Sequence, residues 1–319
     1  MIKILANDGI HPDGKLLLEE ANYQVDTEKI AQENLIHELP NYDVIIVRSA
    51  TKVRKDLIDA CPNLKIIARG GVGMDNIDVA YARSKGIEVV NTPAASSQAV
   101  AELALAHIFT LARSLQTANR ELATENGASK FKNLKSNLSG GIQLQGKTLG
   151  IVGFGRIGQA IAAMALGMGF RVMPTDPFVA EADIKIPILG QKEVTFSIKL
   201  KTFSLEEVLR KSDFLTVHIP GVDKPIIGKP EIEMMKNGAF IVNTARGGAI
   251  DEEALLDALD SGKLGGAGLD VFQNEPNPRQ DLLSHLRVSA TPHVGAETQE
   301  AQVNIGTELA DRIIAFFGD

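Results

Sequence analysis

The segment TLGIVGFGRIGQAIAAM, at residues 148–164, constrains the fold more than any other part of the chain. A short apolar run leads into a glycine-rich turn, and a helical pattern follows at once. This order is typical of a βα unit that holds a dinucleotide. Such a unit needs no residues before its first strand, yet residues 1–147 precede this one. The sequence therefore predicts a second domain upstream of a nucleotide-binding domain.

The spacing of the glycines supports the nucleotide-binding interpretation. Gly153 permits a tight turn, Gly155 lets the backbone approach a pyrophosphate, and Gly158 lets the helix pack closely on the strand. At the end of the next strand, 18 residues after Gly158, Asp176 can accept hydrogen bonds from both ribose hydroxyls and would repel a 2′-phosphate. The pattern predicts NAD as the cofactor rather than NADP. The alternative is a glycine turn kept for packing, beside an exposed aspartate.

The composition is that of a globular protein with a small-molecule partner. The 319 residues are 44% hydrophobic and 23% charged, and the net charge is -7, so neither nucleic acid nor a membrane is expected as a partner. The single cysteine, Cys61, fits a reducing compartment, and no export signal is apparent, so we expect a cytoplasmic protein. The apolar stretch 99–115 is too short to cross a bilayer. No metal site is predicted.

Short β-branched runs alternate with helical segments in two sets, one before residue 92 and one after residue 148. This alternation predicts an α/β protein with two doubly wound parallel sheets. A helical stretch from about 98 to 124 would carry the chain into the second domain, and the last helix would return it to the first. We therefore expect a substrate domain at 1–98 and 292–319 and an inserted NAD-binding domain at 99–291, with a hinge and a cleft.

Three histidines follow predicted strands, and one of them, His293, is accompanied by an arginine and a glutamate that also follow strand ends. His218 and His293 are expected at the ligand edge of the sheet, and His11 less clearly so. Arg246 in NTARGG and Glu275 in QNEPN also come just after strand ends. Oxidation of a 2-hydroxy acid needs a base that takes the hydroxyl proton, and His293 suits this role. The carboxylate of Glu275 would raise the pKa of that imidazole, and the guanidinium of Arg246 would anchor the substrate carboxylate. The alternative is a structural ion pair.

The first domain contains a second candidate cluster, in IIARGGVGMDNID. The glycines around Val72 would expose backbone N–H groups that could bind a carboxylate. Arg69 ends the same strand, and Arg48 ends the neighbouring strand with Ser49 beside it. Two arginines at adjacent strand ends favour a second anionic group on the substrate, such as a phosphate. A plain strand-to-helix turn is the alternative interpretation.

Four segments together resemble the D-isomer-specific 2-hydroxyacid dehydrogenases: GFGRIG, TARGGAIDE, LDVFQNEP and TPHVGAETQEAQ. The resemblance covers nearly the whole chain. It implies a flavodoxin-like substrate domain interrupted by an inserted Rossmann domain, a homodimer joined through helices of the cofactor domain, and a catalytic set of Arg246, Glu275 and His293.

The resemblance also implies which residues bind the two ligands. The implied NAD contacts are Gly153, Gly155, Arg156, Ile157, Gly158, Asp176, His218, Pro220, Thr244, Ala245, Asp270, Gly295 and Ala296. The implied substrate contacts are Arg48, Ser49, Arg69, Val72, Gly73, Arg246 and His293.

Within the family, VRSATKV, ARGGVGMDN and GAETQEAQ resemble the branch that oxidises D-3-phosphoglycerate to 3-phosphohydroxypyruvate in serine biosynthesis. The alternatives are a reductase of glyoxylate or hydroxypyruvate, another D-2-hydroxyacid dehydrogenase and, remotely, an NAD-sensing binding protein that keeps the same residues.

The sequence departs from the family pattern in three places. Ser96 and Ala99 stand where relatives commonly have Asn and Ser, and residues 183–204 form a longer insertion that alternates like a β-hairpin. The sequence stops at Asp319, so feedback inhibition through a serine-sensing regulatory domain is not expected.

Overall fold

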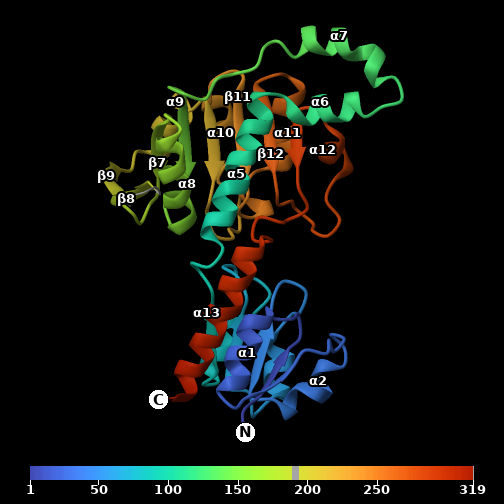
Figure 1. The fold of residues 1–319 in the computed structure, drawn as a ribbon, viewed down its shortest axis with the longest axis vertical. Coiled ribbons are helices and arrows are strands. Elements are labelled where there is room, and N and C mark those ends of the chain that lie inside the picture. The colour runs from blue at the N-terminus through green and yellow to red at the C-terminus, as the bar shows by residue number, and fades with distance from the viewer. Residues whose placement is uncertain (189–193, 319) are drawn as a thin grey trace. The chain divides into compact units, whose positions relative to one another are not determined.

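The structure, a computed structural model, describes residues 1–188 and 194–318 and divides into two compact units. Unit 1 comprises residues 1–99 and 296–319, and unit 2 comprises residues 100–295. The sequence places these divisions after residues 98 and 291, and the structure places them after residues 99 and 295. Figure 1 shows both units as a ribbon, with helices labelled in each unit and several strands labelled in unit 2.

Unit 1 is built on a five-stranded parallel sheet with the strand order β2-β1-β3-β4-β5. This is the flavodoxin-like order, which confirms the predicted fold class. The strands of unit 1 are β1 (Lys3–Ala6), β2 (Gln24–Asp26), β3 (Val44–Val47), β4 (Ile66–Arg69) and β5 (Glu88–Asn91). Its helices are α1 (Pro12–Glu20), α2 (Leu35–Glu38), the 3-10 turn η1 (Leu39–Asn41), α3 (Lys55–Ala60), α4 (Val79–Ser84) and α13 (Gln299–Gly318).

Helices cover both faces of this sheet, so its central strands are apolar throughout. In β3 all four residues are buried, with Val44 and Ile46 packed in one core cluster and Ile45 and Val47 in the other. Alternate side chains of a strand point to opposite faces, so an unbroken β-branched run satisfies both cores.

The return of the last helix to unit 1 depends on a close approach between α13 and α1. A side chain on Gly14 would overlap the backbone of Gly306, so both helices come together at residues without a Cβ. His11 lies at the same contact: its Nδ1 accepts the backbone N–H of Asp13 at 3.3 Å and caps α1. His11 is therefore part of the α1 N-terminus, and its role there is that of a helix cap.

Unit 2 contains a six-stranded parallel sheet with the order β13-β12-β11-β10-β6-β7. Its strands are β6 (Thr148–Val152), β7 (Arg171–Thr175), β10 (Phe214–Val217), β11 (Ala239–Asn243), β12 (Leu264–Leu269) and β13 (Val288–Ala290). The helices are α5 (Ser97–Ala112), which spans the division, α6 (Leu115–Leu122), α7 (Gly127–Asn137), α8 (Arg156–Gly167), α9 (Leu205–Lys211), α10 (Lys229–Met234), the 3-10 turn η2 (Gly247–Ala249), α11 (Glu252–Asp260) and α12 (Gln280–Ser284). Two core clusters lie on its two faces, as expected for a doubly wound sheet.

The helical stretch expected from about 98 to 124 is two helices. The chain breaks after α5 at Ser114, which takes a left-handed backbone conformation with φ of 51°, and α6 follows. The polar segment after α6 also contains a helix, α7, which lies away from the sheet in Figure 1. No helix among the described residues combines the length and the apolarity that a membrane crossing requires.

The insertion at residues 183–204 forms a separate antiparallel pair, β8 (Glu181–Ile188) and β9 (Val194–Lys201). Residues 189–193, which would connect the two strands, lie outside the described residues. The side of the hairpin that carries Ile184 packs against the core beside α8. The alternation of the sequence therefore corresponds to an added hairpin rather than to a strand of the main sheet.

Candidate active site

The register of the unit 2 sheet aligns the ends of all six strands. Val152 pairs with Thr175 and Val217, and the pairing continues through Asn243 and Leu269 to Ala290. Each of these is the last residue of its strand, so the residue that follows lies at one carboxyl edge, where ligands of such sheets bind. The residues in this position are Gly153, Asp176, His218, Thr244, Asp270 and Thr291. Five of them are predicted NAD contacts.

The glycine-rich turn has the geometry that the sequence predicts for a pyrophosphate loop. Gly153 has φ of 94°, and a Cβ there would overlap the carbonyl oxygen of His218. A Cβ on Gly158 would overlap the carbonyl of Gly153, whereas one on Gly155 would meet nothing within 4 Å. The space beside Gly155 lies at the N-terminus of α8, where unpaired N–H groups attract anions.

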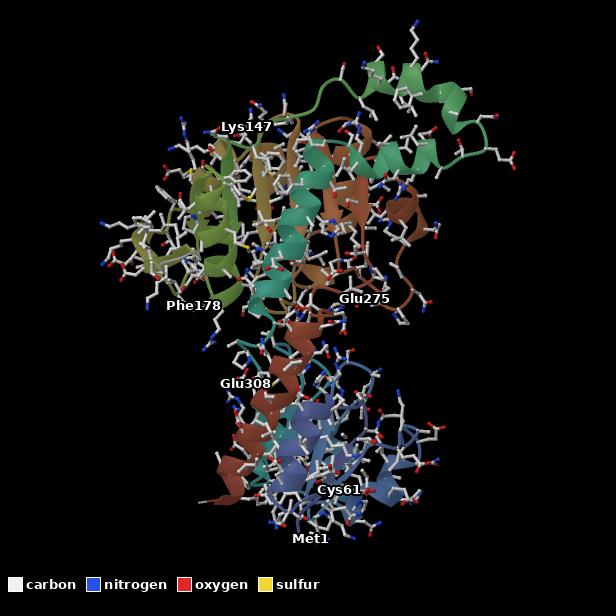
Figure 2. All side chains as sticks on the ribbon, in the orientation of Figure 1. Met1, Cys61, Lys147, Phe178, Glu275 and Glu308 are labelled. Carbon is white, nitrogen blue, oxygen red and sulfur yellow. The ribbon has the colours of Figure 1, made fainter. Side chains whose placement is uncertain are left out.

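Asp176 is held beside this loop by three backbone N–H groups. Its carboxylate accepts hydrogen bonds from Phe154 at 2.7 Å, Phe178 at 2.8 Å and Val179 at 3.1 Å. A carboxylate has about four acceptor positions, so at least one remains for a ribose hydroxyl. Phe178, labelled in Figure 2, is 94% exposed directly after Asp176.

Two buried polar atoms at the same edge lack a partner within the described residues: Nδ1 of His218 and Oγ1 of Thr244. Nε2 of His218 lies 2.9 Å from Oγ1 of Thr216, and burial lowers the pKa of His218 to about 3, so the imidazole is neutral. Buried polar atoms are normally paired, and unpaired ones at a binding edge suit a polar ligand. The donor set of this edge therefore fits a dinucleotide.

Asp270 organises the turn that carries His293. Its Oδ1 accepts the hydroxyl of Thr291 at 2.6 Å and the N–H of Val294 at 2.9 Å, and its Oδ2 accepts the N–H of Gly295 at 2.9 Å. Its own carbonyl accepts the N–H of His293 at 2.7 Å. The turn is thereby fixed from within unit 2, whereas Ala296, another predicted NAD contact, already belongs to unit 1.

His293 and Glu275 form the pair that the sequence predicts. Nδ1 of His293 lies 2.7 Å from Oε2 of Glu275, while Oε1 of Glu275 accepts the N–H of Phe272 at 2.9 Å. The hydrogen bond that His293 donates to the Glu275 carboxylate raises the pKa of His293 in spite of partial burial. Burial opposes ionisation of Glu275, but the bonds from His293 and Phe272 and the charge of Arg246 outweigh it and lower the pKa of Glu275. Nε2 of His293 stays available for chemistry.

Arg246 is positioned by a residue that sequence reasoning missed. The side-chain amide of Asn243 donates to the carbonyl of Arg246 at 2.8 Å, and its oxygen accepts the N–H of Ala245 at 3.0 Å. Nη1 of Arg246 donates to the carbonyl of Ala245 at 2.7 Å. Asn243 ends β11 and is 1% exposed, so its position at a strand end was the available signal.

Glu252 is a second residue that the sequence did not single out. Oε1 of this buried glutamate accepts the N–H of Gln273 at 2.6 Å, which holds the segment that leads to Glu275. Burial raises the pKa of Glu252 although that hydrogen bond opposes the change. Glu252 therefore acts on the site through the backbone of Gln273.

In unit 1, the glycine loop after β4 presents N–H donors next to a cation. The guanidinium of Arg69 folds back over Gly71, where a Cβ would overlap Nη1, and Nη1 donates to the carbonyl of Gly70 at 2.9 Å. Gly71 has φ of 135° and is tied to Thr92. The backbone N–H groups of Val72 and Gly73 bond no acceptor among the described residues. This arrangement can bind a carboxylate.

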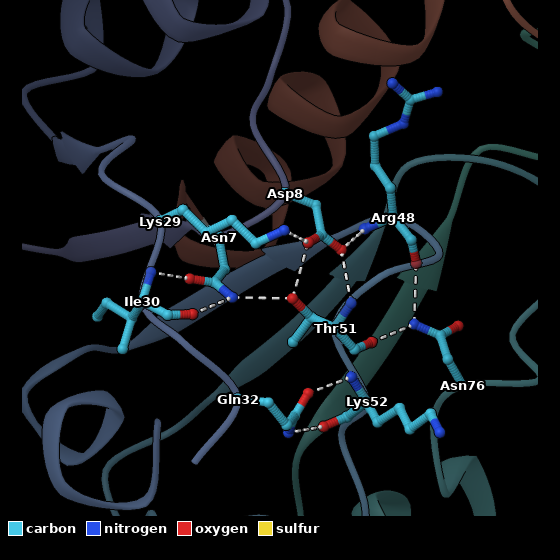
Figure 3. Close-up of polar contacts among 9 residues, drawn as sticks. All are labelled: Asn7, Asp8, Lys29, Ile30, Gln32, Arg48, Thr51, Lys52 and Asn76. Atoms are coloured by element: carbon cyan, nitrogen blue, oxygen red, sulfur yellow. Dashed lines mark hydrogen bonds and ion pairs between the residues drawn. The ribbon is translucent and has the colours of Figure 1, made fainter. Parts of the chain in front are cut away.

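Arg48 borders a hollow of about 380 Å³ at the carboxyl edge of the unit 1 sheet. Figure 3 shows how its backbone is fixed: the N–H donates to Oδ2 of Asp8 at 2.7 Å, and the carbonyl accepts the amide of Asn76 at 2.9 Å. Asp8 also accepts the N–H and the hydroxyl of Thr51 at 3.0 and 2.8 Å. Asp8 follows β1, so its strand-end position could have revealed it.

The hollow includes residues with and without a predicted role. Arg48 and the exposed Ser49, both predicted substrate contacts, line it, whereas Arg69 does not. Lys29 and Glu297 line it as well and were not predicted. Nη2 of Arg48 forms an ion pair with Oε1 of Glu297. Nothing in the sequence pattern distinguishes Lys29, but Glu297 lies within the GAETQEAQ segment.

The pair of His293 and Glu275 makes a testable electrostatic prediction. We expect Glu275→Gln to lower the pKa of His293, because the amide removes both the charge and the accepting carboxylate. An NMR titration of the histidine ring protons measures this, with the signal assigned by its loss in His293→Ala. The matched control is Glu253→Gln, because Glu253 is an exposed glutamate on α11 that pairs with Arg279. This variant should leave the pKa of His293 unchanged. An unchanged pKa in Glu275→Gln would contradict the pairing.

Comparisons with known proteins agree with this geometry. Residues 105–295 match the family described as D-isomer specific 2-hydroxyacid dehydrogenase, NAD binding domain. The chain is 42% identical to a hydroxypyruvate reductase of Thermotoga maritima, over 99% of this chain and 98% of that protein.

Longer relatives and a solved structure are also similar. The chain is 42% identical to a D-3-phosphoglycerate dehydrogenase of Methanocaldococcus jannaschii over 98% of this chain, but it spans only 57% of that protein's length. An NAD+-bound 3-phosphoglycerate dehydrogenase of Entamoeba histolytica superposes with a TM-score of 0.76 at 28% identity, covering 100% of this chain and 96% of that one. From its sequence, its sheet topology and its strand-end residues, this chain belongs to the D-isomer-specific 2-hydroxyacid dehydrogenases, which are NAD-binding oxidoreductases.

Proposed function

We propose that this chain oxidises D-3-phosphoglycerate to 3-phosphohydroxypyruvate with NAD. The observation that carries the proposal is the pair of cationic strand ends in unit 1, because Val47 and Arg69 are register partners and Arg48 follows Val47. The N–H groups of Val72 and Gly73, beside Arg69, suit the carboxylate of such a substrate, and Arg48 suits a phosphate. Several relatives that match at 37 to 42% identity bear this enzyme's name.

The cofactor would be held along the carboxyl edge of the unit 2 sheet. The turn at Gly153 to Gly158, with Arg156 and Ile157 opening α8, would bind the pyrophosphate. Asp176 would bind the ribose. The other predicted contacts at or near this edge are His218, Pro220, Thr244, Ala245, Asp270 and Gly295. When bound, NAD supplies the acceptor for a hydride.

His293 would act as the general base in this reaction. Because Nδ1 faces Glu275, the Nε2 atom is the one that can take the proton of the substrate hydroxyl. Glu275 would stabilise the imidazolium that results and keep the ring in one orientation. Arg246 would hold the substrate carboxylate and polarise the oxygen at C2. In the reverse direction the imidazolium returns the proton, and such acid–base help is worth about 10²–10⁴ in rate.

The substrate assignment is tested with purified protein, NADH and a panel of 2-keto acids. We expect turnover of 3-phosphohydroxypyruvate, and we expect Arg48→Ala to raise its KM about 10- to 100-fold, because a charged hydrogen bond to phosphate is lost. The KM for hydroxypyruvate should rise much less. Arg54→Ala, which removes an arginine paired with Asp78 elsewhere in unit 1, controls for the loss of charge. Turnover of hydroxypyruvate or glyoxylate alone would refute the assignment.

One observation favours a second candidate, a hydroxypyruvate reductase. The guanidinium of Arg48 pairs with Glu297, so the cation proposed for phosphate already has an anionic partner. The relative from Thermotoga maritima that bears this name also matches over nearly its whole length. The same substrate panel separates the two candidates.

Cofactor choice gives a separate prediction for Asp176. Asp176→Ala removes the carboxylate that would bind the ribose hydroxyls and repel a 2′-phosphate, so the preference for NADH over NADPH should fall about tenfold or more. The ratio of kcat/KM for the two cofactors measures it. Asp183→Ala, on the exposed face of the β8–β9 hairpin, serves as the control. A ratio that does not change would show that the carboxylate points away from the ribose.

We also propose that the chain forms a homodimer through the helices that precede β6. Leu115, Leu122 and Phe131 on α6 and α7 are 46%, 44% and 62% exposed, and Leu286 nearby in the fold is 61% exposed. The hydroxyl of Thr117 on α6 donates to the carbonyl of Leu286 at 3.3 Å, and Lys130 on α7 donates to Glu121 on α6 at 2.9 Å. These apolar side chains therefore lie in one region of unit 2. Exposed apolar side chains that gather in this way mark interaction surfaces.

Sedimentation velocity tests the dimer. We expect a species of twice the chain mass of 34.2 kDa. Leu122→Glu combined with Phe131→Glu should give the monomer, whereas Phe196→Glu on the hairpin, 54% exposed outside this region, should leave the dimer intact. A monomeric wild-type protein would overturn the proposal.

A further inference from the structure

The ion pair between Arg48 and Glu297 joins two residues whose backbones are both fixed within unit 1. Arg48 is held by Asp8 and Asn76, as Figure 3 shows. Glu297 precedes Thr298, whose hydroxyl accepts the N–H of Ala301 at 3.1 Å at the start of α13. The pair is therefore built by two anchored segments far apart in the sequence.

The backbone on the other side of Glu297 is anchored as well. The side-chain amide of Gln302 donates to the carbonyl of Ala296 at 2.8 Å, and the N–H of Gln302 donates to the carbonyl of Thr298 at 3.0 Å. The side chain of Glu297, which is 42% exposed, can leave the guanidinium while its backbone stays fixed. Loss of the ion pair thus requires a rotamer change and no backbone movement.

The charges around the hollow balance, which is unusual for a phosphate site. Its lining contains two acids, Asp8 and Glu297, and two bases, Lys29 and Arg48. The buried carboxylate of Asp8 is already engaged by backbone N–H groups, by Thr51 and, at 3.9 Å, by Lys29. The remaining carboxylate, Glu297, offsets Arg48, so a phosphate dianion would meet a neutral surface with an acid beside it.

We propose that Glu297 is a specificity-determining residue that competes with the phosphate of a substrate for the guanidinium of Arg48. Resting on the proposed function, this extends it by assigning to one carboxylate the ratio at which phosphorylated and unphosphorylated 2-keto acids are used. The phosphate of a substrate binds Arg48 only after it displaces the Glu297 carboxylate. The bound phosphate then remains close to the negative charge of Glu297, which repels it. A substrate with a neutral hydroxyl at C3 displaces nothing and meets no repulsion.

The effect should appear in KM and leave kcat in place, because the C3 substituent is remote from the atoms that react. A tenfold change in affinity corresponds to about 1.4 kcal/mol. This lies between the roughly 1 kcal/mol of two unit charges about 4 Å apart in water and the roughly 2 kcal/mol of a unit charge at the same distance from a phosphate dianion. We therefore expect removal of the Glu297 charge to lower the KM of a phosphorylated substrate about tenfold. The KM of hydroxypyruvate should change much less.

The test compares Glu297→Gln with Glu300→Gln. Glu300 lies in the first turn of α13, is exposed, and has no cationic partner among the described residues, so its variant removes the same charge from the same region. Steady-state kinetics with 3-phosphohydroxypyruvate and with hydroxypyruvate give the ratio of kcat/KM for each variant. The inhibition constant of inorganic phosphate against hydroxypyruvate reduction gives a second readout that does not depend on the natural substrate.

In Glu297→Gln we expect the ratio to shift about tenfold toward the phosphorylated substrate and the inhibition constant of phosphate to fall by a similar factor. Glu300→Gln should match the wild type. In Arg48→Gln combined with Glu297→Gln the gain should disappear, because the competition needs the guanidinium. Equal ratios in the wild type and Glu297→Gln would overturn the inference, as would a gain that persists without Arg48.

The outcomes also separate this inference from the proposed function. If the wild-type enzyme does not turn over 3-phosphohydroxypyruvate but Glu297→Gln does, phosphoglycerate oxidation is refuted and the role of Glu297 is supported. If the wild-type enzyme turns over 3-phosphohydroxypyruvate and Glu297→Gln leaves the ratio of kcat/KM for the two substrates unchanged, the proposed function is supported and the role of Glu297 is refuted.

Discussion

Backbone pairing in the two parallel sheets is the constraint on which the rest of the structure depends. Because the strands run in register, the residue after each strand reaches the same edge, and in unit 2 this edge collects Gly153, Asp176, His218, Thr244 and Asp270 from the ends of five separate strands. Parallel pairing requires a crossover between strands, so these residues lie far apart in the sequence. The cofactor edge is thus a product of strand register rather than of one motif.

Networks of buried acceptors then convert this edge into a site with defined side-chain positions. Asp270 fixes the turn of His293, Asn243 fixes Arg246, and Glu252 fixes the segment before Glu275. Unit 1 uses the same principle, since Asp8 holds the backbone on both sides of the strand-end loop at Arg48. Asp270, Asn243 and Asp8 each make several hydrogen bonds at or just after a strand end, and Glu252 makes one from the start of α11. Such buried partners pre-organise the neighbouring groups.

Much of this was predictable from particular residues. The glycines at 153, 155 and 158 require the turn that they form, and the unbroken run at Val44 to Val47 requires a strand covered on both faces. Other features depend on atoms that no local pattern reveals. The break at Ser114 interrupts a stretch with continuous helical periodicity, and the close approach of α1 to α13 at Gly14 and Gly306 joins segments at opposite ends of the sequence.

The sequence by itself determined the two α/β units and the cofactor, because both depend on residue types at fixed spacings along strands and turns, and it predicts the acid–base set of Arg246, Glu275 and His293. Only the tertiary structure decided which partners those residues have. The structure shows that Nδ1, rather than Nε2, of His293 faces Glu275, and that Arg48 pairs with Glu297, which lies 249 residues away in the sequence. Such pairings are set by how helices pack on a sheet, and side-chain spacing along the chain contains no record of them.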